Sequence, residues 1–301
     1  MDLRQLRYFV VVAEECHFGR AAERLHMAQP PLSQSIRRLE HSLGVTLLAR
    51  TTRRVTLTPA GERYLERARS ILADVDAAAR EAVRVEAGEL GRVVLGVVGS
   101  LTYALLPALA RRLREDFPDI EFEFTSEMLT PELMAALREG TVDVALMRTP
   151  ADTRDLMARA LRSEPLIAAL PTTHPLTQKS VLDLLDLKGE PFVTYPPDHR
   201  SVIYDTVLAA CQAQGFSPNQ VAQVAQTSTL LVFVAAGVGV TVLPASARGL
   251  HLDGVEFRDL TRAPTVELAV AWRPASPAAT QKVVDRIAEL IPAGALAATG
   301  L

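Results

Sequence analysis

Cysteine is scarce in this chain of 301 residues, which has only Cys16 and Cys211, far apart in the sequence. There is no CxxC pair and no cluster of cysteine with histidine, so the sequence supports neither a disulfide framework nor a zinc site. Cys16 lies among short helical segments, where we expect a buried, small, apolar side chain. Cys211 lies on the apolar face of a later predicted helix.

A hydrophobic run long enough to span a membrane is also missing. The longest uncharged stretch lies between Asp205 and Arg248, and its apolar centre, from Leu230 to Leu243, is interrupted by two glycines. That centre has about 14 residues, whereas a spanning helix needs roughly 20. The first residues lack the apolar core of a signal peptide. We therefore expect a cytoplasmic protein with no membrane partner.

Lysine is rare and the net charge is small, at −3, which excludes a uniformly basic nucleic-acid coat. The charge is uneven, however. Residues 1–60 hold nine arginines and five acidic residues, a balance of +4, whereas residues 61–301 hold 23 basic and 30 acidic residues, a balance of −7. A basic head on an acidic body indicates an anionic polymer partner at one end. The length suits two or three domains.

The head shows three helical patterns followed by a hairpin pattern. Apolar residues recur at helical spacing over 3–15, and a short second helix is predicted over 18–25. The third helix begins near Gln29 or Pro30, because proline is tolerated in a first turn, and ends at Gly44. Residues 45–57 predict a small β-hairpin. This order is typical of an all-α winged helix-turn-helix.

The third helix can read a major groove if one face is buried and the other is free. Leu32, Ile36 and Leu39 form the buried stripe. The free side then carries Gln29, Pro30, Ser33, Gln34 and Arg37. Side chains of these types bond base edges and phosphates, and Arg53 and Arg54 at the hairpin tip would contact phosphate or the minor groove. The pattern alone leaves open a packing module that binds no DNA.

A long helix is predicted from Thr58, its cap, to about Glu86. Small and apolar residues repeat along it at spacings of three and four: Leu65, Ala68, Leu72, Val75, Ala79 and Ala82. Such a narrow seam is typical of two-stranded packing between copies of the chain. The alternative is a helix that lies on its own domain, and we favour the seam.

From Arg92 onward, strand and helix patterns alternate, which predicts parallel sheets covered by helices. The predicted strands span 92–99, 120–126, 142–147, 166–170, 192–195, 220–224, 238–243 and 267–272. The predicted helices span 103–117, 131–139, 181–185, 202–214, 228–236 and 280–290. The body is therefore one or two α/β units.

Hydroxyl residues begin four helices of the body: Ser100, Thr130, Ser201 and Thr227. Helix starts offer free N–H groups and a positive dipole end, and Arg148 follows a buried strand at the matching sheet edge. Simple capping would explain each start alone. Taken together they favour an anion site, with Arg148 pairing a ligand carboxylate.

The sequence shows no enzyme motif in the context that the motif requires. The Gly237–Gly239 pattern follows a helix and precedes a strand, the reverse of the order in dinucleotide sites. Ser246 lacks the G-x-S-x-G context of a nucleophile elbow. His174 and His199 are lone loop residues. We expect no enzyme activity, no cofactor and no metal.

The segment LRYFVVVAEECHFGRAAERLHMAQPPLSQSIRRLEHSLGVTLLARTTRRVTLTPAGERYL resembles the DNA-binding head of the LysR-type transcriptional regulators. Matching features include Ala21-Ala22, Gln29-Pro30, Leu39-Glu40, Leu43-Gly44 and Ala60-Gly61. Leu48 departs from the commoner aromatic, which should alter only hairpin packing. The resemblance implies that Gln29, Pro30, Ser33, Gln34 and Arg37 meet the groove, and that Arg53 and Arg54 are wing contacts.

The same resemblance implies the domain plan. Residues 1–58 would form the winged helix-turn-helix, 59–88 a linker helix for dimerisation, and 89–301 a two-lobed effector domain like a periplasmic binding protein. Lobe I would take 92–163 and 266–301, and lobe II 164–265, with two crossings of the chain. The implied partners are double-stranded DNA, a small effector and further copies in a dimer of dimers, a homotetramer. RNA polymerase is a further candidate partner.

Two segments of the body resemble the branch of this family that responds to aromatic-degradation products such as benzoate or muconate. They are YPPDHRSVIYDTVLAACQAQGFSP and TSTLLVFVAAGVGVTVLPAS. This places six residues near an organic or aromatic acid: Ser100, Thr130, Arg148, Val202, Ile203 and Gln226. A peroxide sensor would need two reactive cysteines in the body, where only Cys211 lies. The alternative function is a solute-binding protein that uses only the two-lobed body.

Overall fold

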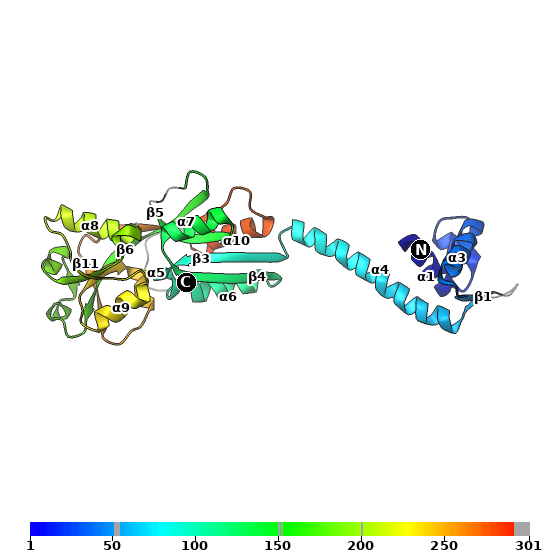
Figure 1. Cartoon of the computed structure of the whole chain (residues 1–301), viewed down its shortest axis with the longest axis horizontal. Helices are drawn as coiled ribbons and strands as arrows, with labels where there is room; N and C mark the ends of the chain where they lie inside the picture. Colours follow the sequence, from blue (N-terminus) through cyan, green and yellow to red (C-terminus); the bar gives the residue numbers. More distant parts are fainter. Residues whose placement is uncertain (51–54, 150, 152, 200, 292–301) are drawn as a thin grey trace. The chain divides into compact units, whose positions relative to one another are not determined.

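The computed structural model describes residues 1–50, 55–149, 151, 153–199 and 201–291 (Figure 1). The chain divides into two compact units, Met1–Val83 and Arg84–Leu301. Arg53 and Arg54, the expected wing contacts, lie outside the described residues. None of the described helices is both long enough and apolar enough to cross a membrane.

The first unit is a helical head. Its elements are α1 (Leu3–Glu15), α2 (Phe18–Arg24), α3 (Gln29–Leu43), β1 (Leu48–Arg50) and β2 (Val55–Leu57). The strands form an antiparallel hairpin. Phe9, Leu32, Ile36 and Leu39 are fully buried between the helices, so the predicted stripe of α3 is its core face. The predicted helices and hairpin are therefore confirmed.

The turn between α1 and α2 corrects one expectation. Cys16 is exposed, because it ends α1 in the left-handed conformation at φ 49° and its side chain points away from the core. His17 then caps α2, with Nδ1 accepting from the Gly19 and Arg20 backbone N–H groups at 3.0 and 3.3 Å. Local capping, not packing, decides the conformation here.

Helix α4 (Pro59–Glu86) begins against the head and continues beyond it. Gly61 is required in the first turn, because a Cβ there would lie 2.0 Å from the Leu47 carbonyl oxygen. Ala68 is buried, and Leu65 and Leu72 pack on the head core. The first part of the expected seam therefore lies on its own domain, whereas the second part does not: Ala79 and Ala82 are exposed.

The second unit is built on one eight-stranded sheet and one two-stranded sheet. The large sheet has the order β4-β3-β5-β12-β6-β11-β7, with β10 also paired to β6. Its strands are β3 (Gly91–Val98), β4 (Ile120–Met128), β5 (Val144–Thr149), β6 (Met157–Pro171), β7 (Val181–Leu182), β10 (Thr241–Pro244), β11 (Val255–Leu260) and β12 (Thr265–Trp272). The small sheet pairs β8 (Pro191–Thr194) with β9 (Asn219–Gln223) in parallel.

Two hydrophobic cores divide this unit into lobes. Leu161 and Leu268 belong to the first core, whereas Leu166 and Val266 belong to the second. The chain therefore passes between the cores along β6 and returns along β12. In the first lobe β3, β4 and β5 run parallel, as predicted, but β12 is antiparallel to both β5 and β6.

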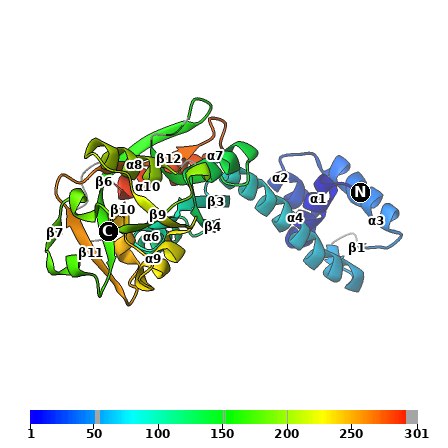
Figure 2. The ribbon, with the colours of Figure 1, turned by 60° about the vertical axis from the view of Figure 1, so that its left-hand side comes forward.

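Helices cover both faces of the sheets (Figures 1 and 2). In the first lobe these are α5 (Gly99–Thr102), α6 (Leu106–Asp116), α7 (Thr130–Glu139) and α10 (Ala278–Leu290), and in the second α8 (Val202–Ala213) and α9 (Thr227–Ala235). Figures 1 and 2 show α8 and α9 on opposite sides of the second lobe. Gly96 faces α7, where a Cβ would lie 2.4 Å from Leu133, so only glycine allows this close packing.

Several element predictions differ from the structure. The helix expected over 103–117 is present as α6, which starts later, at Leu106, and the separate short helix α5 precedes it. The helix expected over 181–185 is the short strand β7 followed by a 3-10 turn, Leu184–Leu187. Strand β6 has 15 residues rather than the expected 166–170, and β11 was not expected at all. Both strands alternate charged with apolar residues, which hides them from a search for apolar runs.

Candidate functional site

The outer side of α3 is free in the described structure. Gln29, Pro30, Gln34 and Arg37 are exposed and Ser33 is half-buried. The N-cap, Ala28, supplies no side-chain hydrogen bond, and prolines occupy the first turn. The side chains, rather than backbone N–H groups, must therefore supply most polar contacts at this end.

Part of the positive charge of the head is uncompensated on α3. Glu14 pairs with Arg69 at 2.8 Å and with Arg24 at 2.9 Å, and these hydrogen bonds lower the pKa of the Glu14 carboxyl. Arg37 and Arg38 on α3, and Arg4 on α1, are exposed and form no ion pair among the described residues. The charge of Arg37 and Arg38 would attract an anionic backbone to α3.

The hairpin that follows α3 is held by one carboxylate. Glu40 Oε1 accepts from the backbone N–H groups of Leu47 and Leu48, at 2.9 and 3.0 Å. Leu48, the residue that departs from the family pattern, is 1% exposed and packs in the head core. A smaller apolar side chain is therefore accommodated there, and the wing starts from a fixed point.

A buried ion pair joins the two lobes of the second unit. Arg148, at the end of β5, is 1% exposed, and Glu164 on β6 is fully buried. Arg148 Nη2 lies 2.5 Å from Glu164 Oε2, in ion-pair contact though off hydrogen-bond geometry. The other carboxylate oxygen accepts from the Ser246 N–H on the second lobe. The guanidinium is thus already partnered by a carboxylate of the chain.

Hydroxyl groups surround this pair. Arg148 Nη2 donates to Ser100 Oγ at 3.1 Å and to Ser246 Oγ at 3.3 Å. Thr130 Oγ1 accepts from the Arg148 backbone N–H at 3.1 Å, so this hydroxyl holds the strand end. Arg148 Nε and Nη1, however, meet no acceptor among the described residues. Buried donors of a charged group are costly to leave unpaired, which points to a ligand or water.

A second guanidinium lies near the same carboxylate. Burial lowers the pKa of Arg162, while the charge of Glu164 raises it and that of Arg148 lowers it. Two guanidinium groups and one carboxylate leave one net positive charge in this buried region. The arrangement can accept one anionic group.

The predicted residues of the second lobe lie at two helix starts. Ser201 Oγ caps α8 by accepting from the Tyr204 N–H at 3.4 Å. Val202 and Ile203 follow it, and α8 packs against β5, the strand that carries Arg148. Gln226 is the exposed N-cap of α9. Both helices thus belong to the region between the lobes: α8 packs against the strand of Arg148, and α9 packs against α5, whose Ser100 contacts Arg148.

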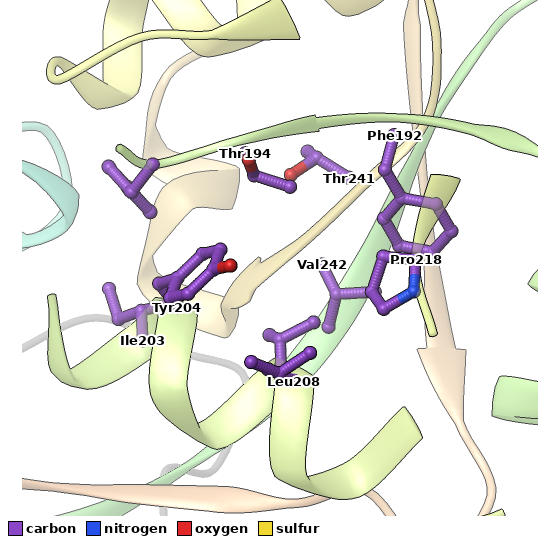
Figure 3. A pocket seen from close by; sticks show the side chains of 10 residues that line it. Phe192, Thr194, Ile203, Tyr204, Leu208, Pro218, Thr241 and Val242 are labelled. Carbon is purple, nitrogen blue, oxygen red and sulfur yellow. The ribbon is translucent and has the colours of Figure 1, made fainter. Parts of the chain in front are cut away.

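A small pocket lies between α8 and the strands of the second lobe (Figure 3). Ile203, Tyr204 and Leu208 line it from the helix, and Phe192 and Val242 from the strands. Its lining is mainly apolar, and the buried Thr194 Oγ1 has no partner among the described residues. The free space inside it is about 10 Å³, room for about one water molecule, so a larger apolar group would enter only if the walls moved apart.

Sequence reasoning missed four residues of this region: Glu127, Glu164, Tyr195 and Ser246. Glu164 had a detectable signal, because it is a lone acid next to the apolar run of β6. Tyr195 is buried, and burial is the main cause that raises its pKa to about 12; its hydroxyl lies 2.8 Å from Thr227 Oγ1. Nothing in the sequence marked Glu127, which lies on β4.

The two thiols should react very differently. Burial raises the pKa of Cys211 to about 11, whereas Cys16 is exposed. At pH 8 only about one Cys211 thiol in a thousand would be ionised even with full access. We expect iodoacetamide to label Cys16 quickly and Cys211 only after unfolding, as measured by mass spectrometry. Rapid labelling of Cys211 in the folded protein would contradict its burial. Redox sensing by this thiol would then again be a candidate function.

Comparison with known proteins agrees with both units. The model of the bacterial regulatory helix-turn-helix protein, lysR family, matches residues 3–62, and that of the LysR substrate binding domain matches residues 86–291. The transcriptional regulator AlsR of Bacillus subtilis is 38% identical over 272 residues, 90% of this chain and 89% of that protein. The probable cat1 operon transcriptional activator of Acinetobacter lwoffii is 38% identical over 259 residues, 86% and 85% of the two chains.

A solved structure supports the same assignment. Full-length CbnR in complex with its target DNA superposes with a TM-score of 0.81 at 27% identity, covering 96% of this chain and 100% of that one. The helix-turn-helix match excludes a solute-binding protein that uses the body alone, and the relatives are regulators rather than enzymes. The chain therefore belongs to the LysR family and is a DNA-binding transcriptional regulator with an effector-binding domain.

Proposed function

We propose that this regulator responds to a small organic acid bound between the two lobes, beside Arg148. The observation that carries the proposal is the buried guanidinium whose Nε and Nη1 meet no acceptor among the described residues. A ligand carboxylate would supply acceptors for these donors and would balance the net positive charge of Arg148, Arg162 and Glu164. Ser100 and the start of α8 would complete the polar contacts.

The apolar part of the ligand would lie toward α8. Ile203 lines the small apolar pocket, and Val202 is half-buried beside it. An aromatic or short aliphatic acid matches this chemistry of one charged and one apolar end, and its binding would require the pocket, with about 10 Å³ of free space, to open. The named relatives do not narrow the choice of effector, because AlsR and the probable cat1 operon transcriptional activator have the same sequence identity to this chain, 38%.

In the head, we propose that Gln29, Pro30, Ser33, Gln34 and Arg37 contact the major groove, and that Arg53 and Arg54 contact the backbone or minor groove. Support comes from the exposed side of α3 and its unpaired positive charge.

Domain boundaries near 58 and 88 are consistent with the described helix α4. RNA polymerase stays a candidate partner.

The second half of α4 supports a homo-oligomer. Val83 and Val85 are 69% and 51% exposed, and Val75, Ala79 and Ala82 lie along the same part of the helix. A long polar helix with such a stripe gains stability from a second copy. We propose that α4 forms a dimer seam through this half, and that two dimers assemble into a tetramer.

The effector proposal is tested by thermal unfolding of the full chain with organic acids. A true ligand at 100 times its Kd should add about 2.7 kcal/mol of stability, a rise in Tm of about 5–10 °C for the second unit. Each acid is paired with its amide, such as benzoate with benzamide, which keeps the shape and removes the charge. Equal shifts with acid and amide, or none with any acid, would reject an acidic effector.

A further inference from the structure

Glu127 places a carboxylate at the start of a helix on the other lobe. It lies at the end of β4 in the first lobe, and its Oε2 accepts from the backbone N–H of Thr227, the first residue of α9, at 3.1 Å. Its Oε1 accepts from the Tyr103 hydroxyl at 2.7 Å. The first N–H group of α9 and the positive dipole end of this helix thus already meet an anion of the chain itself.

The surrounding backbone is shaped around this carboxylate. Glu127 has φ 61°, a left-handed backbone conformation that is strained for a residue other than glycine. A Cβ on Gly99 would lie 2.6 Å from Glu127 Oε2 and 2.8 Å from Thr227 Oγ1. A strained glutamate and a glycine opposite it therefore allow the two lobes to meet around a single carboxylate.

The position of Glu127 is close to the proposed effector site. Ser100, the neighbour of Gly99, accepts a hydrogen bond from Arg148 Nη2 through its Oγ. The charges of both Glu127 and Arg148 act on the buried Tyr195 hydroxyl, which also contacts Thr227. The interlobe region thus has a positive end at Arg148, with unpaired donors, and a second anion position at α9 that is filled.

We propose that Glu127 sets the charge of the effector: it occupies the anion position at α9, so the site accepts a ligand with one carboxylate and rejects a second. This rests on the proposed effector site beside Arg148. A dicarboxylate that reached across the lobes would bring its far carboxylate against Glu127, where like charges repel in a partly desolvated region. A monocarboxylate with an apolar or neutral far end avoids that cost.

The test uses the full chain with Glu127→Gln and Glu127→Ala. The glutamine keeps an acceptor for the Thr227 N–H and a polar group for Tyr103, but removes the charge. We expect cis,cis-muconate, a dicarboxylate, to bind Glu127→Gln at least about tenfold more tightly than the wild type, while benzoate changes by less than about twofold. Binding is measured by calorimetry.

The alanine variant tests whether the position itself binds a carboxylate. Removing the side chain empties the anion position, which acetate should then fill. Acetate at about 100 mM should raise the Tm of Glu127→Ala by about 3 °C more than that of the wild type. Glu132→Ala is the matched control, because Glu132 also accepts from a helix-start N–H, at Leu129, but is exposed. Acetate should not distinguish it from the wild type.

The outcomes separate the two proposals. If muconate gains no affinity in Glu127→Gln, or acetate stabilises Glu127→Ala no more than Glu132→Ala, the role of Glu127 is overturned. A wild type that bound muconate but no monocarboxylate would also overturn it, whereas a wild type that responds to no acid at all would reject the acidic effector itself. That result is independent of Glu127, because the muconate and acetate measurements are differences between variants.

Discussion

Replacing Arg148 by alanine should destabilise the effector-binding unit by about 3–5 kcal/mol, because it leaves Glu164 charged and buried without its partner. Arg148 is 1% exposed and Glu164 is fully buried, so water cannot replace the guanidinium without opening the structure. Trp272 is the only tryptophan of the chain and packs in the core of the same lobe. Urea unfolding followed by its fluorescence therefore measures this unit.

Two variants control this result. Arg159 makes an exposed ion pair with Asp285, at 3.9 Å with both side chains more than half exposed, so Arg159→Ala should change stability by no more than about 1 kcal/mol. The double variant Arg148→Met with Glu164→Gln removes both charges and keeps an acceptor for the Ser246 N–H. It should recover most of the loss. Equal stabilities of Arg148→Ala and Arg159→Ala would contradict a buried pair.

This expectation changes how Arg148 can be tested as an effector contact. A loss of ligand response in Arg148→Ala would follow from destabilisation alone, even if the residue never touched the ligand. The acid and amide comparison avoids this problem, because the protein is unchanged. The charge of the effector can thus be decided before any residue of the pair is altered.

The head could be predicted from the sequence almost element by element, because its signals are local. Prolines at the start of α3, Gly44 at its end and the buried stripe of Leu32, Ile36 and Leu39 fix the helix without distant contacts. The exception was Cys16, where a left-handed helix end turns an apolar side chain outward. Local signals do not reveal that choice, since glycine or asparagine usually marks it.

The interlobe region was less predictable, because its contacts join distant segments. Arg148 was singled out by its place after a buried strand, but its partner Glu164 lies on a strand that continues through both lobes. The charged residues at 159, 162 and 164 interrupt the apolar pattern of β6, so the crossing was not visible as a strand. Glu127 was invisible for the same reason: its partner, Thr227, is 100 residues away.

The helix predicted over 103–117 begins at Leu106, after a break that separates it from α5, and a local signal marks this start. Pro107 lies in the first turn of α6, and a proline there marks a helix start rather than an interior. The break lets α5 end beside the second lobe, where a Cβ on Gly249 would lie 2.8 Å from the Ala104 backbone. The interruption therefore belongs to the packing between the lobes.

Substitutions on the exposed side of α3 should separate base contacts from phosphate contacts. The assay first selects a DNA site for the wild-type protein from a random duplex library, then measures affinity by anisotropy at several salt concentrations. Gln34→Ala should cost about 1–3 kcal/mol on the selected site and broaden the base preference at one position, with little change in salt dependence. A glutamine that bonds a base edge carries sequence information but releases no counterion.

Arg37→Ala gives the complementary result. If the guanidinium meets a phosphate, affinity falls on selected and random DNA alike and the slope of log K against log salt decreases by about 1; if it meets guanine, affinity falls only on the selected site. Arg80→Ala removes the same charge from α4 and should leave the base preference unchanged. Wild-type affinity and selectivity in both Gln34→Ala and Arg37→Ala would show that the free side of α3 does not read DNA. Since both side chains are exposed, neither substitution disturbs the head core, so any change reports on the duplex.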